Sequence, residues 1–136
     1  KKCATTDAGF KYGLCGGAGG TVALTAGGVS SLYLLGPNDL AEIEQGLSYM
    51  SGRQHDPAVK EKESGYYYYA TYYATLAWSH KGGIQWNDWW GKVSGEVAAR
   101  QHPDGGWSGP YDPHLCTAFA CLVLSAPRKD LAVWRD

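Results

Sequence analysis

Apolar and small residues recur at helical spacing in five segments of the chain, separated by short stretches rich in glycine and proline. The clearest case is the series Leu40, Ile43, Leu47 and Met50, whose intervals put all four side chains on one face of a helix. No segment shows the strong period of two that is typical of a strand. The pattern therefore predicts an all-α fold of about five helices, at residues 21–35, 39–53, 66–80, 87–101 and 113–126.

Residues that commonly begin and end helices support these limits. Asp112 is expected to cap the last helix, with Pro113 at its first position. Asn87 or Asp88 is expected to begin the fourth helix, after Gly82–Gly83 has ended the third. Short connections between helices predict antiparallel αα-hairpins. The expected organisation is an irregular glycine-rich segment at 1–20, a helical domain at 21–127 and a tail at 128–136.

The third predicted helix begins with a dense group of tyrosines. Helical spacing puts Tyr66, Tyr69 and Tyr73 on one face and turns the other tyrosines of this run elsewhere. Rings on such a face either belong to the core or line a cavity for a ligand. The candidate ligand-lining residues are Tyr66, Tyr69, Tyr73, Trp86 and Trp90.

Composition narrows the classes of function. The chain has 136 residues and a formal net charge of −1, which argues against nucleic-acid binding because such proteins usually carry a basic excess. No apolar run of about 18 residues is present, so no transmembrane segment is predicted. The 10 tyrosines and 6 tryptophans are rings of the kind that bind apolar molecules, sugars or protein partners.

The chain has four cysteines, and no two of them form a Cys-x-x-Cys pair. This spacing indicates neither a zinc ribbon nor a thioredoxin-type redox motif. Cys116 and Cys121 lie in an apolar segment and are expected to be buried free thiols. Cys3 and Cys15 are either free or joined by a disulfide, and a disulfide would favour a secreted or periplasmic protein.

Two segments of the chain are similar to each other. Each closes on Arg-Gln at the predicted end of a helix, and the two arginines, Arg53 and Arg100, are 47 residues apart. That length corresponds to two helices and their loops, so each hairpin is one repeat unit. The second copy continues as Gln101-x-x-x-Gly105-x-Trp107, which resembles the QW motif of the squalene cyclases and the related repeats of protein prenyltransferase β subunits. The similarity covers residues 21–127.

The resemblance implies that the chain forms part of an α/α toroid, in which this motif links an outer helix to the next inner helix. It implies that the Gln101 amide satisfies backbone groups at a helix terminus and that the Trp107 ring stacks on it. A complete toroid has more than five helices, which implies a missing half of the same protein or self-association. The implied ligand is an apolar, isoprenoid-like molecule or a protein partner.

The acidic cluster of the cyclases has no counterpart, because the aspartates of this chain are scattered. The sequence therefore assigns no catalytic residue and leaves open whether the chain is an enzyme; no cofactor is expected, and two alternatives remain. In the first alternative the chain is the C-terminal half of an active isoprenoid-processing enzyme, and in the second it is a glycan-binding or glycan-active toroid.

A zinc site is the candidate metal centre, since imidazole, carboxylate and thiolate groups lie close together in sequence around one loop. The same groups are also ordinary in turns and helix caps. These residues are His102, Asp104, Asp112, His114 and Cys116.

Overall fold

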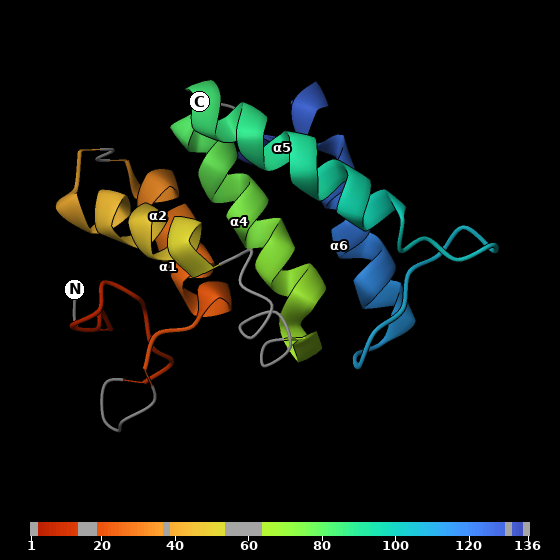
Figure 1. Ribbon diagram of the computed structural model, residues 1–136, viewed down its shortest axis with the longest axis horizontal. Coiled ribbons are helices and arrows are strands. Elements are labelled where there is room, and N and C mark those ends of the chain that lie inside the picture. Colours follow the sequence, from red (N-terminus) through yellow and green to blue (C-terminus); the bar gives the residue numbers. More distant parts are fainter. Residues whose placement is uncertain (1–2, 14–18, 37–38, 54–63, 130–131, 135–136) are drawn as a thin grey trace.

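The computed structural model describes residues 3–13, 19–36, 39–53, 64–129 and 132–134 (Figure 1). In these ranges, extended pairing is limited to two isolated bridges that join Phe10 to Ala4 and to Thr21. The predicted all-α fold of about five helices is confirmed. The α-helices are α1 (Val22–Leu35), α2 (Ala41–Arg53), α4 (Tyr67–Lys81), α5 (Gly83–Ala98) and α6 (Pro113–Ser125), and the 3-10 turns are η1 (Ser64–Tyr66), η2 (Ala126–Arg128) and η3 (Ala132–Trp134).

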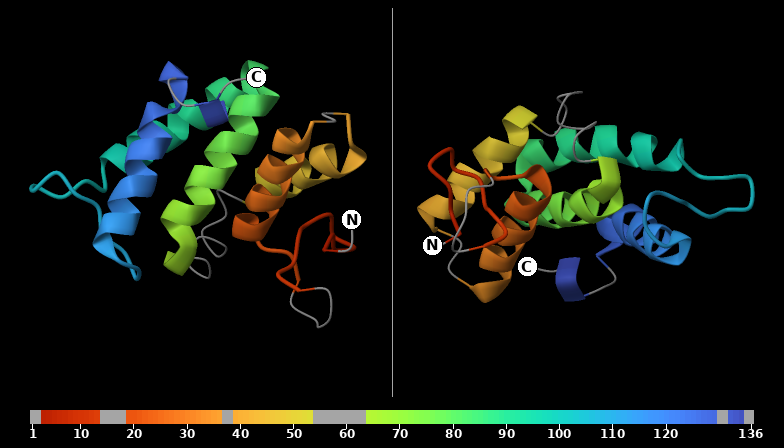
Figure 2. Two further views of the ribbon diagram at one scale, coloured as in Figure 1. Left: turned by 180° about the vertical axis from the view of Figure 1, so that it is seen from behind. Right: turned by 90° about the horizontal axis from the view of Figure 1, so that it is seen from below.

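The helices form two layers. In one layer α1, α4 and α6 run in the same direction, and in the other α2 and α5 lie across them (Figure 1, Figure 2). Contacts along α1 and α4 show that these two helices are parallel. Ser30 Oγ donates to the carbonyl of Tyr73, 2.8 Å away, and the rings of Tyr33 and His80 stack closer to the C-terminal ends.

Helix α4 lies at the centre of the fold and contacts α1, α5 and α6. Every residue from Ala74 to Ser79 is buried, and the buried hydroxyls among them have partners. The Thr75 hydroxyl donates to the carbonyl of Thr71 and accepts from the Trp89 indole N–H, 3.1 Å away. The contact between Thr75 and Trp89 joins α4 to α5, which crosses α4 obliquely and runs in the opposite sense, so the two form the predicted antiparallel hairpin (Figure 1).

The predicted separation of Tyr66, Tyr69 and Tyr73 from the other tyrosines is wrong at the start of this helix. Tyr66 is 54% exposed, whereas Tyr68 is only 9% exposed. Tyr66 belongs to the η1 turn rather than to α4, so helical spacing does not place it with Tyr69 and Tyr73. In addition, α4 has neighbours on several sides, so no single face of it forms the core.

The start of α6 follows the predicted capping chemistry, and the start of α5 does not. Asp112 caps α6 by accepting from the backbone N–H of His114 at 2.8 Å, as expected. Helix α5, however, begins at Gly83 and not at Asn87. Gly82 and Gly83 both have positive φ angles, +68° and +64°, which reverse the chain within two residues. Because this reversal needs no longer loop between α4 and α5, residues 84–86, which were expected to precede the helix, already belong to it.

The two ends of the described chain also contribute to packing. The predicted irregular N-terminal segment contains no helix among its described residues, but the Phe10 ring packs directly over Gly28 of α1, and the Phe10 N–H donates to Thr25 Oγ1 at 2.9 Å. At the other end, Trp134 is buried against Leu76 and Ala126. The segment expected to be a tail therefore supplies a core residue.

Candidate functional site

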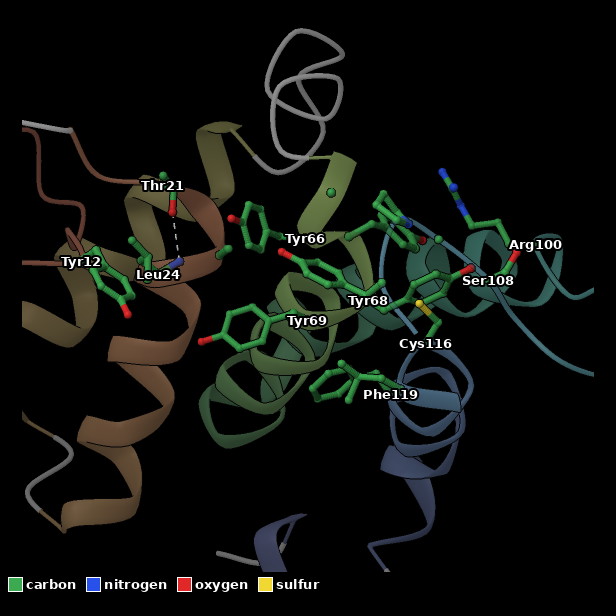
Figure 3. A pocket seen from close by; sticks show the side chains of 17 residues that line it. Tyr12, Thr21, Leu24, Tyr66, Tyr68, Tyr69, Arg100, Ser108, Cys116 and Phe119 are labelled. Atoms are coloured by element: carbon green, nitrogen blue, oxygen red, sulfur yellow. Dashed lines mark hydrogen bonds between the residues drawn. The ribbon is translucent and has the colours of Figure 1, made fainter. Parts of the chain in front are cut away.

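A cavity of about 590 Å³ lies at the end of the fold where α1, α4 and α6 begin (Figure 3). The first turns of these three helices form much of its wall, together with residues 108–111. Figure 3 shows Tyr12 towards one end and Arg100 towards the other, with Tyr68 and Tyr69 between them. The lining residues are Tyr12, Thr21, Ala23, Leu24, Gly65, Tyr66, Tyr67, Tyr68, Tyr69, Arg100, Ser108, Gly109, Pro110, Tyr111, Leu115, Cys116 and Phe119.

Aromatic rings dominate the wall of the cavity, which includes six tyrosines. The rings of Tyr67 and Tyr68 meet edge to face with 5.0 Å between centroids, and those of Tyr69 and Phe119 with 6.1 Å. Burial raises the pKa of Tyr67, Tyr68 and Tyr69 above the ordinary value for a phenol. A phenol is already neutral at pH 7, so these side chains present apolar faces with hydroxyl groups at their rims.

Arg100 and Tyr67 form a cation–π pair in this wall. The guanidinium carbon of Arg100 lies 4.1 Å from the centroid of the Tyr67 ring. The Tyr67 hydroxyl oxygen is buried and makes no hydrogen bond of ordinary length and angle with a described residue, although the Thr71 hydroxyl lies close enough to lower its pKa slightly. A buried hydroxyl without a partner has lost water without gaining a protein hydrogen bond, which destabilises the fold.

Replacing Tyr67 by phenylalanine is expected to raise the free energy of unfolding by about 1 kcal/mol, because it removes the unpartnered hydroxyl and keeps the ring beneath Arg100. Equilibrium unfolding in urea at pH 7 measures the change. Tyr12→Phe is the control, since Tyr12 is almost fully exposed and its replacement is expected to have no measurable effect. A loss of stability in Tyr67→Phe would contradict the prediction.

Cys116 brings a free thiol to the cavity. Its side chain is buried, and a Cβ atom added to Gly109 would lie 3.4 Å from its sulfur. Cys121 is also free but exposed, so its predicted burial is wrong. Five residues turn a side chain by roughly 140° around a helix, which takes Cys121 away from the face of Cys116. Cys3 is a free thiol, and Cys15 lies outside the described residues.

The structure divides the five predicted ligand-lining residues into two groups. Tyr66 and Tyr69 line the cavity. Tyr73 lies one turn further along α4 and packs its ring against that of Tyr69, with 4.8 Å between centroids. Trp86 and Trp90 stack on each other on α5, with 5.5 Å between centroids, and do not line the cavity.

Several lining residues with a ring or a charge were not predicted. Tyr67 and Tyr68 could be recognised only once α4 was known to contact three other helices. Arg100 belongs to the Arg-Gln pair of the second repeat copy, but the similarity between the two copies does not indicate a cavity. Tyr12 and Tyr111 come from irregular segments, whose paths hydrophobic periodicity does not report.

The QW-like segment forms a turn that links α5 to α6. Gln101 Nε2 donates to the carbonyl of Gly105 at 2.8 Å, and Gly105 has a φ of +86°, which favours glycine. Trp107 is buried, and its indole N–H donates to the carbonyl of Val97 in the last turn of α5 at 2.8 Å. Its backbone N–H donates to Thr117 Oγ1 of α6 at 3.0 Å. Trp107, rather than Gln101, therefore supplies the hydrogen bond at the helix terminus.

The loop residues considered for zinc are His102, Asp104, Asp112, His114 and Cys116. Among the described residues, which include all five, no group of three or more His, Cys, Asp or Glu side chains is arranged to hold a metal ion. Asp104 accepts from the backbone N–H of Gly106, and Asp112 caps α6. These two carboxylates therefore take the turn and cap roles that the sequence also allowed.

Comparison with known proteins adds no relative. No protein-family profile matches the chain, and neither a curated protein nor a solved structure matches it. The resemblance of Gln101–Trp107 to the QW motif stays a prediction, and Gln54 of the first repeat copy lies outside the described residues. In the part of the chain that the structure describes, no helix is both long and apolar enough to cross a membrane.

Proposed function

We propose that the chain is a helical domain of the terpenoid cyclase and prenyltransferase type that binds an apolar, isoprenoid-like molecule in the tyrosine-lined cavity. The cavity itself is the observation that carries this proposal. Small-molecule sites in proteins are concave and mostly apolar, with a few polar groups that orient the ligand. A cavity of about 590 Å³ with six tyrosines and few other polar groups has this character.

The helix arrangement supports the proposed relationship. One layer of parallel helices, with antiparallel partners across it, is what a toroid of αα-hairpins requires. The two repeat copies fall in corresponding places, since Arg53 ends α2 and Arg100 follows α5. The site would be formed at the ends of the parallel helices, where their first turns meet.

The proposed activity is binding rather than catalysis. Among the described lining residues there is no carboxylate and no imidazole that would act as a general acid or base. Tyrosine phenols are neutral at pH 7 at their ordinary pKa, and burial raises the pKa of Tyr67 and Tyr68 further. The cavity thus offers ring faces and hydroxyl groups to an uncharged hydrocarbon skeleton.

Farnesol, a 15-carbon isoprenoid alcohol, is expected to bind the wild-type protein with a dissociation constant on the order of 10–100 μM, as measured by isothermal titration calorimetry. Leu115→Trp is expected to weaken this binding about 10-fold or more. Leu115 lines the cavity from the first turn of α6 and is 47% exposed, so a larger ring narrows the cavity without entering the core.

Leu34→Trp is the matched control for this experiment. Leu34 is a similarly exposed leucine on α1, 55% exposed, and does not line the cavity. Its replacement is expected to leave farnesol binding unchanged. Absence of saturable binding to the wild type, or equal weakening by both substitutions, would contradict the proposed function.

A further inference from the structure

Arg100 gives the cavity a charge as well as an apolar wall. It is the only residue with a formal charge among the described residues that line the cavity. No described carboxylate forms an ion pair with it, and Glu96, one turn earlier on α5, does not line the cavity. Arg100 is itself exposed, so an anion would meet it at the rim of the cavity, where hydrogen bonds from the guanidinium rather than a low dielectric constant give the interaction its strength.

The other repeat copy shows how the fold uses an arginine in a related place. The guanidinium carbon of Arg53 lies 4.0 Å from the centroid of the Tyr49 ring, as that of Arg100 does over Tyr67. Tyr49 belongs to the same helix as Arg53, whereas Tyr67 comes from α4, so the two pairs are alike in contact but not in origin. Arg53 also forms an ion pair with the carboxylate of Asp7, with 3.7 Å between Arg53 Nη2 and Asp7 Oδ2.

We propose that the molecule bound in this cavity carries a carboxylate, which Arg100 binds as Arg53 binds Asp7. This inference rests on the proposed function and specifies its ligand. An arginine stacked on a ring keeps the N–H groups at its edge available, and these match the two oxygens of a carboxylate. The ring of Tyr67 also limits the freedom of the guanidinium, so that less entropy is lost on binding.

The position of Arg100 also orients the ligand. Arg100 lies towards one end of the row of lining residues, and Tyr12 towards the other (Figure 3). Between them are ring faces and aliphatic groups, including Tyr69, Leu24 and Phe119. The ligand class that fits is an elongated hydrocarbon acid, with its carboxylate at Arg100 and its chain directed towards Tyr12.

Farnesoic acid and farnesol test this inference, because they share one hydrocarbon chain and differ in the head group. The wild-type protein is expected to bind the carboxylate about 10-fold more tightly than the alcohol in calorimetric titrations at pH 8. Arg100→Gln is expected to reduce this ratio to about 1, because it removes the charge that distinguishes the two head groups; both compounds are titrated into the same variant, so a change in cavity shape affects both alike. In the wild type the ratio is also expected to fall as ionic strength rises.

Arg53→Gln is the matched control, because Arg53 also lies over a tyrosine ring but outside the cavity. It is expected to retain the 10-fold preference, and Arg100→Lys to retain part of it. Equal binding of acid and alcohol by the wild type, or an unchanged preference in Arg100→Gln, would overturn the carboxylate assignment alone. Failure of both compounds to bind would overturn the proposed function, and the assignment with it.

Discussion

Replacing Trp107 by alanine is expected to lower the free energy of unfolding by about 4 kcal/mol, the largest effect of any single change considered. Trp107 is 4% exposed, so its removal leaves a large cavity between α5 and α6. The change also removes the indole hydrogen bond to the Val97 carbonyl. Equilibrium unfolding in guanidinium chloride, followed by circular dichroism at 222 nm, measures the loss.

Two further substitutions separate the contributions within this loop. Trp107→Phe keeps most of the buried ring but loses the indole N–H, and is expected to cost about 1–2 kcal/mol. Gln101→Ala is expected to cost less than about 1 kcal/mol, because the Gln101 side chain is exposed and makes one hydrogen bond within the turn. A larger loss for Gln101→Ala than for Trp107→Ala would refute this ranking.

Replacing Gly46 by alanine is expected to lower the free energy of unfolding by about 2 kcal/mol. Gly46 lies where α2 crosses α1, and an added Cβ would penetrate well inside van der Waals distance of Val29 Cγ2. Val29 is fully buried and β-branched, so its side chain has little freedom to move. The helix propensity gained by alanine, about 1 kcal/mol, offsets only part of this overpacking.

Gly52→Ala provides the matched control, because Gly52 is in the same helix and has nothing within 4 Å of an added Cβ. It is expected to stabilise the protein by up to about 1 kcal/mol, through helix propensity alone. Thermal unfolding of both variants beside the wild type gives the comparison. Stabilisation by both substitutions would show that the two helices are not packed closely at Gly46.

The candidate site was only partly predictable. Tyr66 and Tyr69 were predicted to line a ligand site because their spacing put them on one face of a helix, and both line the cavity although Tyr66 belongs to the η1 turn. That same spacing included Tyr73, which packs beside Tyr69 outside the cavity, and excluded Tyr68, which lines it. Spacing shows which side chains share a face, but it does not show how far along the helix a neighbouring element ends.

The loop between α5 and α6 shows the same limit at the level of hydrogen bonds. Its residues were predicted to link two helices, and they do. The resemblance implied that the Gln101 amide makes the hydrogen bond at the helix terminus. In the structure the Trp107 indole donates to the Val97 carbonyl, and Gln101 makes its hydrogen bond within the turn. The choice depends on which side chain points between the helices once they pack, and that direction is not a local property of the sequence.

By itself the sequence determined the class of the fold, the number of helices and several of their ends. Those features depend on local interactions, such as hydrophobic spacing, the Asp112 cap and the Gly82–Gly83 break. Only the tertiary structure decided that α4 is central, that Trp134 is buried and that Arg100 joins six tyrosines around one cavity. Burial depends on how many neighbours surround an element and in which direction they run. Those neighbours are distant in sequence, so no local pattern contains them.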